Sequence, residues 1–185
     1  MFGVMFASAA ANTVPESGAD DVSDPLQIAD LQPDECTGMT LTNLVSGSGS
    51  IDGTNANDLI LGSGISDTVN ARGGGDCILA GPGDDVISGR NGDDVILGGD
   101  GLDELIGGGG SDTLYGENDA DLITGGGQGD TIYGGSGADD LRGNNGNDVI
   151  YGGPGDDQID GGRGNDVCYG EGGTDTFTRC ETEIQ

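Results

Sequence analysis

The sequence predicts an all-β protein built as a solenoid, in which two parallel sheets wind around one thin core with 18 residues per coil. Three observations support this fold. An Asp recurs every nine residues from Asp58 to Asp175, an apolar residue stands two places after each of them, and the four tyrosines repeat every 18 residues. A fixed short period indicates stacked structural units. Aligned on the Asp residues, positions 53–178 divide into fourteen nine-residue units without insertion.

The chain before the repeats divides into three predicted segments. Residues 1–11 are short, apolar and end in small residues, which fits the end of a secretory signal peptide that lacks a basic start, or an ordinary N-terminal tail. Residues 12–35 carry seven acidic residues and three prolines, so we expect an acidic disordered linker. Residues 36–52 are less polar and end in a degenerate unit, 44–52, with Ile51 in the apolar position. We expect this segment to lead into the solenoid or to cap it.

Each repeat unit is expected to contain a turn and a strand. Glycine dominates positions one, two and four, where it allows the positive φ values of a tight turn. Positions seven to nine are rich in residues that favour strands, and since strand side chains alternate between faces, position eight should point inward. The inward column is Ile60, Val69, Ile78, Ile87, Ile96, Leu105, Leu114, Ile123, Ile132, Leu141, Ile150, Ile159, Cys168 and Phe177. Stacking these units would bury one continuous thin core.

The outward residues indicate that two units make one coil. Position nine is Tyr115, Tyr133, Tyr151 and Tyr169 in alternate units, and the same column continues as Leu97, Leu79 and Leu61. Position nine of the other units is mostly polar. This alternation predicts two parallel sheets of seven strands each, with different outer faces.

The best units have glycine at positions one, two and four and Asp at position six: they begin at Gly98, Gly134, Gly152 and Gly161. Across 53–178 the chain thereby resembles the RTX, or hemolysin-type, calcium-binding repeat family. The resemblance implies a parallel β-roll, in which Asp carboxylates and backbone carbonyls of adjacent loops hold each calcium ion. It implies two ligand columns, Asp58, Asp76, Asp94, Asp112, Asp130, Asp148, Asp166 and Asp67, Asp85, Asp103, Asp121, Asp139, Asp157, Asp175. Seven loops leave six gaps in each column, and therefore up to about 12 Ca²⁺.

Some loops depart from the family pattern. Ala56, Ile65, Asp119 and Gln128 replace the glycine of position four, and Glu117 and Glu171 replace that of position two. A residue with a side chain costs energy wherever φ must be positive. We expect the loops at 53–58 and 62–67 to be the weakest calcium sites.

The charge balance excludes some functions and favours metal binding. The formal net charge is −29, with 34 acidic residues, five basic residues and no His. Nucleic acid is excluded as a direct partner, because binding it requires cations to neutralise phosphates. Bound calcium would offset the acidic repulsion, so the chain should be compact when loaded and expanded when empty.

Four cysteines suggest two disulfides, Cys168 with Cys180 and Cys36 with Cys77. The first would lock the C-terminal end of the solenoid, where residues 179–185 form a cap, and the second would tie the lead segment to the outer face. The alternative is four free thiols in a reducing cytosol. The cysteine spacing does not suggest zinc.

The sequence favours a secreted calcium-binding β-roll that folds on binding several Ca²⁺ ions and acts as a structural or binding module. We expect no enzyme, since the chain lacks His and Lys and has neither a nucleophile elbow nor an HExxH motif. No stretch is long enough for a membrane span. The alternative is an adhesin, or a glycan- or ice-binding solenoid, that uses the tyrosine-bearing outer face. That face could also contact the N-terminal segment or a second copy. The short C-terminal tail and the cysteines favour export by an N-terminal signal.

Overall fold

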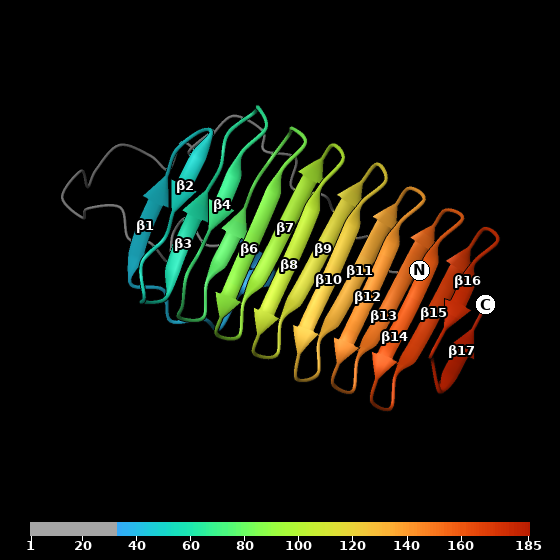
Figure 1. Ribbon diagram of the computed structural model, residues 1–185. Helices are drawn as coiled ribbons and strands as arrows, with labels where there is room; N and C mark the ends of the chain where they lie inside the picture. Colours follow the sequence, from blue (N-terminus) through green and yellow to red (C-terminus); the bar gives the residue numbers. More distant parts are fainter. Residues whose placement is uncertain (1–32) are drawn as a thin grey trace, which may run out of the picture.

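A computed structural model describes residues 33–185 as a flattened solenoid of two parallel sheets (Figure 1). Sheet A contains β1 (Asn43–Ser46), β3 (Asp58–Leu61), β5 (Cys77–Leu79), β7 (Val95–Asp100), β9 (Thr113–Asn118), β11 (Thr131–Ser136), β13 (Val149–Pro154), β15 (Val167–Gly172) and β17 (Thr182–Ile184). Sheet B contains β2 (Ser50–Asp52), β4 (Thr68–Asn70), β6 (Val86–Asn91), β8 (Glu104–Gly109), β10 (Leu122–Gly127), β12 (Asp140–Asn145), β14 (Gln158–Arg163) and β16 (Thr176–Thr178). The predicted all-β fold with two parallel sheets is confirmed. The predictions for residues 1–32 lie outside the described residues.

Strand register confirms the 18-residue coil. In sheet A, Ile132 pairs with Ile150, and in sheet B, Leu105 pairs with Ile123, so each strand lies beside the strand one coil away. Successive strands along the chain alternate between the two sheets. This alternation explains why the tyrosines of alternate units share one face.

The prediction of seven strands in each sheet is wrong, because sheet A has nine strands and sheet B has eight. The extra strands are β1 and β2 before the repeats and β17 after them. Both β1 and β17 pair with an offset of 15 residues instead of 18. The end of a solenoid exposes unpaired backbone groups, and these short strands cover two of those edges.

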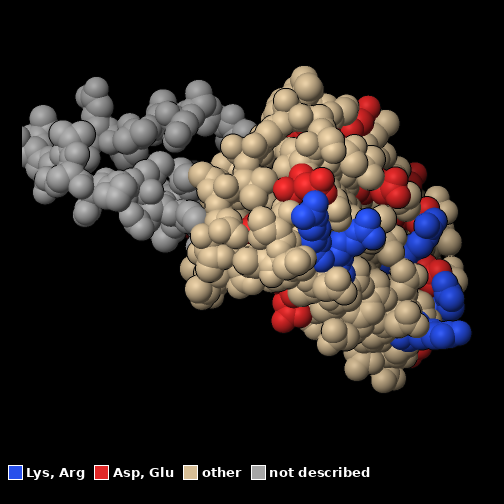
Figure 2. Space-filling model, turned by 60° about the vertical axis from the view of Figure 1, so that its left-hand side comes forward, with Lys and Arg blue, Asp and Glu red and all other residues tan. Residues whose placement is uncertain are grey.

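Figure 2 shows arginine side chains gathered on one face of the solenoid, several of them beside acidic side chains. The ion pairs of residues 33–185 are Arg72 with Asp52, Arg142 with Asp140 and Arg179 with Asp160. All six side chains belong to the strands of sheet B or to the turns that follow them. None of these pairs involves an Asp of the nine-residue period.

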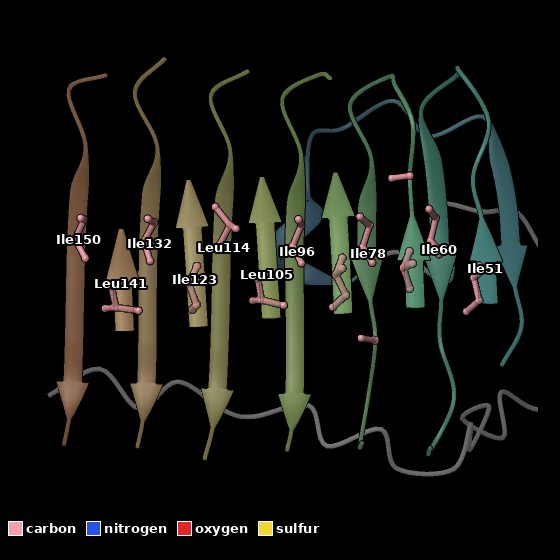
Figure 3. Packing of buried hydrophobic residues seen from close by; sticks show 14 of the residues in the cluster. Ile51, Ile60, Ile78, Ile96, Leu105, Leu114, Ile123, Ile132, Leu141 and Ile150 are labelled. Carbon is pink, nitrogen blue, oxygen red and sulfur yellow. The ribbon is translucent and has the colours of Figure 1, made fainter. Parts of the chain in front are cut away.

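The core is one ladder of position-eight side chains between the sheets (Figure 3). Ile60, Ile78, Ile96 and their equivalents from both sheets are fully buried, and Ile51 continues the ladder at the N-terminal end. Cys168 is buried in the same column, while Phe177 and Val45 close the ends and are partly buried. The predicted inward column is therefore confirmed, and each coil adds only two core side chains.

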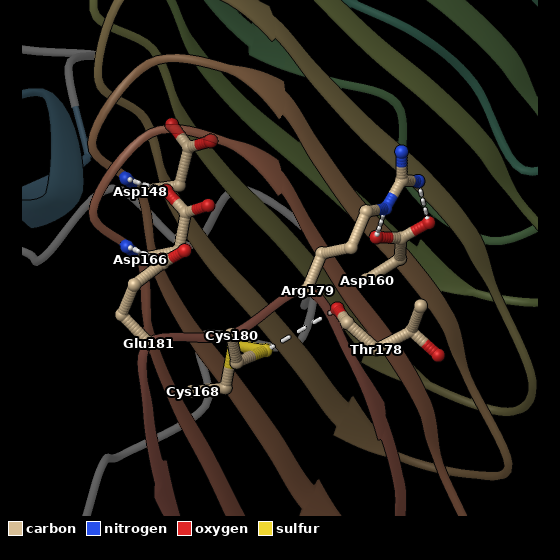
Figure 4. The surroundings of a disulfide bond; sticks show 8 residues. All are labelled: Asp148, Asp160, Asp166, Cys168, Thr178, Arg179, Cys180 and Glu181. Carbon is tan, nitrogen blue, oxygen red and sulfur yellow. Dashed lines mark hydrogen bonds and ion pairs between the residues drawn. A yellow bond between two sulfur atoms is a disulfide. The ribbon is translucent and has the colours of Figure 1, made fainter.

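Two disulfides hold the ends of the solenoid, with the predicted connectivity. Cys36 pairs with Cys77 of β5, and Cys168 of β15 pairs with Cys180, just before β17 (Figure 4). Cys36 ends a short 3-10 helix, η2 (Asp34–Cys36), so Asp34 and Glu35 belong to ordered structure and not to the predicted linker.

The lead segment covers the outer face of sheet A at its N-terminal end. Leu59 and Cys77 point outward from their strands, yet both are fully buried, because Met39 and Leu41 pack over them with Cys36. Farther along the sheet, the tyrosine side chains are only half-buried. In the described part of the chain, no helix has the length and hydropathy needed to cross a membrane.

Candidate metal centre

The repeat Asp residues form two buried columns. The turns that carry them lie along the two edges of the solenoid (Figure 1). The turns that lead into sheet A carry the column from Asp58 to Asp166, and those that lead into sheet B carry the column from Asp67 to Asp175. All of them except Asp175 are at most 3% exposed. The structure thus places the predicted ligands in the two predicted columns. These carboxylates are buried in a chain that has only five basic side chains.

One oxygen of each carboxylate binds the neighbouring coil. The backbone N–H of each Asp donates to Oδ1 of the Asp 18 residues later, as from Asp94 to Asp112 and from Asp121 to Asp139. Twelve such bonds run along the two columns, six in each, with N···O distances from 2.6 to 3.1 Å. Figure 4 shows one of them, from Asp148 to Asp166. The Asp side chains therefore link adjacent coils through hydrogen bonds that need no bound ion.

The other oxygen has no protein partner. Eleven buried Oδ2 atoms lack a hydrogen bond: those of Asp76, Asp85, Asp94, Asp103, Asp112, Asp121, Asp130, Asp139, Asp148, Asp157 and Asp166. Leaving one buried acceptor unsatisfied costs roughly 1–3 kcal/mol, and more if it is charged. A regular array of such atoms requires either protonation or a cation.

Glycine at position one leaves room beside nine of the eleven unpaired oxygens, whereas Ala71 and Ala80 hold that position in the units of Asp76 and Asp85. A Cβ on Gly98 would collide with Oδ2 of Asp103 and would lie 3.1 Å from the carbonyl oxygen of Gly116, one coil later. The same arrangement recurs at Gly134, beside Asp139. At eight loops a small space is therefore bordered by one carboxylate oxygen and one carbonyl oxygen. Hard divalent cations such as Ca²⁺ prefer oxygen ligands of these two kinds, so the residues present fit calcium.

Side-chain carboxylates alone would not make the site. Among residues 33–185, no place gathers three or more Asp, Glu, Cys or His side chains that could hold a metal ion. Each coil adds only one carboxylate to a column, and the two columns lie on opposite edges. A calcium ion would need backbone carbonyl oxygens of the loops as well, as the resemblance implies.

Burial raises the pKa of these carboxyl groups. The pKa rises to about 6 for Asp76, to about 7 for Asp94 and to about 8 for Asp121, chiefly because burial disfavours the charged form. The hydrogen bond from the preceding coil lowers each pKa, and neighbouring carboxylates raise it. Asp103 and Asp130 reach about 7, and Asp112 and Asp157 about 6, for the same main reason. A divalent cation would reverse this preference by favouring the charged form.

Three of the predicted ligands differ from the rest. Oδ2 of Asp58 accepts a hydrogen bond from the N–H of Thr54, and Oδ2 of Asp67 accepts from the N–H and the hydroxyl of Ser63. Oδ2 of Asp175 accepts from the Gln185 amide. The loops expected from the sequence to be weakest, 53–58 and 62–67, are thus two of the three whose carboxylates already have partners.

The sequence reasoning missed the residues that end one Asp column. Oε2 of Glu181 accepts from the N–H of Asp166 at 2.7 Å, in the place of a further Asp (Figure 4). At the other end, the Asn43 amide donates to Oδ1 of Asp58. Both residues stand 15 positions from their partners, outside the nine-residue period. The offset itself is the only signal that could have identified them.

The reasoning also missed three residues at position two. Arg72, Arg90 and Asn144 have φ between 73° and 80° there, like the predicted exceptions Glu117 and Glu171. Asp119 and Gln128 adopt positive φ at position four as predicted, whereas Ala56 and Ile65 do not. The backbone of most loops therefore keeps the glycine conformation even without glycine, at an energetic cost.

Comparison with known families agrees with this geometry. The family described as "RTX calcium-binding nonapeptide repeat (4 copies)" matches residues 52–87, 72–105, 79–114, 97–132, 106–141, 115–150 and 142–177. These overlapping matches cover about two thirds of the chain. A search of curated proteins finds no match. With its repeat period, its parallel roll and its columns of buried Asp, the chain belongs to the RTX calcium-binding nonapeptide repeat family.

Proposed function

We propose that the chain is a secreted β-roll that folds when calcium binds along both Asp columns and then serves as a structural or binding module. One observation carries this proposal: eleven buried carboxylate oxygens lie in register without a hydrogen-bond partner. The arginine ion pairs of the described residues lie elsewhere, on the side of sheet B. The neutralising charge must therefore come from protons or from a bound cation. At neutral pH and extracellular calcium levels, Ca²⁺ fits the available oxygens.

The unpaired oxygens support a limit on the number of ions. If each site uses one of them, the roll binds at most eleven Ca²⁺ ions, one fewer than the number of gaps suggests. The ligands would be these Oδ2 atoms together with loop carbonyls such as that of Gly116. Asp58, Asp67 and Asp175 would contribute least, because the chain already satisfies their second oxygen.

Export to an oxidising compartment is the second part of the proposal. The two disulfides support it, since such bonds persist outside the cytosol. Calcium is scarce in the cytosol, so the chain would stay unfolded until export was complete. The intact mass of the secreted protein would show whether residues 1–11 are removed, as an N-terminal signal predicts.

We propose a non-enzymatic role. The chain has no His and no Lys, which removes the commonest general base and the amine nucleophile. Calcium binding alone accounts for the buried Asp columns, so no catalytic role is needed to explain them.

The tyrosine-bearing outer face supports the alternative role, glycan binding, less well than the Asp columns support calcium binding. The rings of Tyr115, Tyr133, Tyr151 and Tyr169 stack on one another, with centroids 4.7–4.8 Å apart and planes within 6°. The inner rings therefore cover each other's faces and present mainly edges and hydroxyls. Sugar rings stack on aromatic faces, so this arrangement favours a structural ladder.

Circular dichroism tests the coupling of calcium to folding. We expect a strand spectrum in millimolar calcium and its loss after EGTA is added, with recovery when calcium is restored. Magnesium at the same concentration is the control, because it prefers six-coordinate sites that keep several waters. A strand spectrum that persists in EGTA at neutral pH would contradict the proposal.

A further inference from the structure

The outer face of sheet A is apolar along its whole length, but the described chain covers only half of it. The outward residue Leu97 of β7 stands between two groups of outward residues, which are Leu59, Leu61, Cys77, Leu79 and Val95 at the N-terminal end and Thr113, Tyr115, Thr131, Tyr133, Val149, Tyr151, Val167 and Tyr169 beyond it. The first group packs against Cys36, Met39 and Leu41. The second group is half-buried. An apolar strip of this length usually has a partner.

The lead segment crosses the strands in one direction. Thr42 donates to the carbonyl of Asn57, just before β3. Cys36 is bonded to Cys77 in β5. Figure 3 shows this segment, in blue, passing behind the strands that carry Ile78 and Ile96. As residue numbers fall from 42 to 36, the chain therefore moves from β3 toward the tyrosine-bearing strands.

The first described residues reach the start of the tyrosine ladder. Burial raises the pKa of the Tyr115 hydroxyl, and the Tyr133 hydroxyl and the Glu35 carboxylate raise it further. The pKa of Glu117, also in β9, is raised by burial and then by Glu35. Glu35 thus lies close enough to β9 for its charge to act there. The next strands in the same direction are β11, β13 and β15.

The chain before Pro33 has the length and the composition to continue along this path. The ladder from Tyr115 to Tyr169 is about 14 Å long. An extended chain spans about 3.3 Å per residue, so roughly five residues would follow the ladder. Residues 22–32 include Leu26, Ile28 and Leu31.

We propose that residues 22–32 dock on the tyrosine ladder and bring Leu31 against Tyr133, Ile28 against Tyr151 and Leu26 against Tyr169. Two features of this chain favour its own segment over a second copy. The Cys36–Cys77 disulfide tethers the segment beside the ladder, which gives it a high effective concentration. Even with eleven Ca²⁺ ions bound, each copy would keep a formal charge of about −7, so two copies would repel each other more than a tethered segment is repelled.

Tyrosine fluorescence gives a direct test, because the protein has four tyrosines, all in the ladder, and no Trp. The full chain is measured in calcium while acrylamide quenches the emission. The test variant combines Leu26→Ser, Ile28→Ser and Leu31→Ser. The control combines Val14→Ser and Ala19→Ser, which removes apolar surface farther from Pro33. Circular dichroism in calcium checks that each variant keeps the roll.

We expect the quenching constant to rise about twofold in the test variant, since the outer edges of half-buried rings become accessible, and to stay unchanged in the control. Equal quenching of the wild type and the test variant would overturn the proposal. If the tyrosines become protected from quenching only as the protein concentration rises, and the mass is that of a dimer, the face would be assigned to a second copy. Protection that appears only on adding a soluble oligosaccharide would assign it to a glycan. Either result would also overturn the proposal.

Discussion

The space beside Oδ2 of Asp130 can be filled without replacing any proposed calcium ligand. Gly125 and Gly127 lie at the end of β10, in the unit of Asp130, and neither has a positive φ. A Cβ on Gly125 would lie 2.9 Å from Cβ and Cγ of Asp130 and closer still to its Oδ2, whereas a Cβ on Gly127 would meet only the carbonyl of Gly108, at 3.8 Å. Carbon atoms normally approach to about 3.5–4.0 Å. Gly125→Ala therefore forces the carboxylate to move, and Gly127→Ala does not.

The two variants should separate by a measurable free energy. Overpacking of this kind costs roughly 1–3 kcal/mol, which corresponds to about a 5- to 150-fold loss of affinity at that loop. Gly127→Ala should instead stabilise the roll by about 0.4–1 kcal/mol, by restricting the unfolded chain. Calcium titration by calorimetry, followed by urea unfolding in saturating calcium, measures both effects. Equal affinity and stability for the two variants would refute the assignment of calcium to the space beside the Asp oxygens.

Three further predictions concern charge, pH and the chain ends. Asp121→Asn should remove about one bound ion and weaken cooperativity, whereas Asp58→Asn should leave the ion count unchanged, since Oδ2 of Asp58 is already bonded; native mass spectrometry counts the ions, and equal losses would contradict the difference. Because burial raises the pKa of Asp121 to about 8 and of Asp94 to about 7, the metal-free folded form holds protons that the unfolded chain releases near pH 4. Its stability should therefore be greatest below about pH 4 and fall as the pH rises toward 8, while calcium affinity should rise over the same range; circular dichroism in EGTA between pH 4 and pH 8 and calcium titrations at pH 5 and pH 8 test both signs, and a strand signal in EGTA that grows as the pH rises would contradict them. Replacing Cys168 and Cys180 by Ser should destabilise the C-terminal coil by about 2–3 kcal/mol, as expected for a loop of this length; hydrogen exchange should show the loss in β15 and β17 but not in β9, and uniform loss would argue against a local cap.

Much of the fold could be predicted because one short period determines it. Position eight had to be apolar and position six had to be Asp in every unit, so the core ladder and both Asp columns follow from the alignment alone. The 18-residue coil followed from the four tyrosines, whose side chains stack only if they lie on adjacent strands of one sheet. Periodic sequences are favourable cases, since each coil contacts only its neighbours.

The parts that could not be predicted lie where the period stops. The strand β1 pairs at an offset of 15 residues, and so does β17; no repeat marks either of them. The role of Glu181 as the last acceptor of its column depends on that offset. The unpaired oxygens could not be predicted from the sequence either. The pattern places an Asp in each loop, but it does not show which of the two carboxylate oxygens bonds to the neighbouring coil.

The most direct test of the account is a crystal structure grown in calcium, with anomalous diffraction used to locate the ions. The account predicts ordered peaks beside the unpaired Oδ2 atoms from Asp76 to Asp166, in two rows along the edges of the roll, and none beside Asp58 or Asp67. An intact roll in calcium with no ions in those rows, its buried carboxyl groups protonated or bound to water, would contradict it.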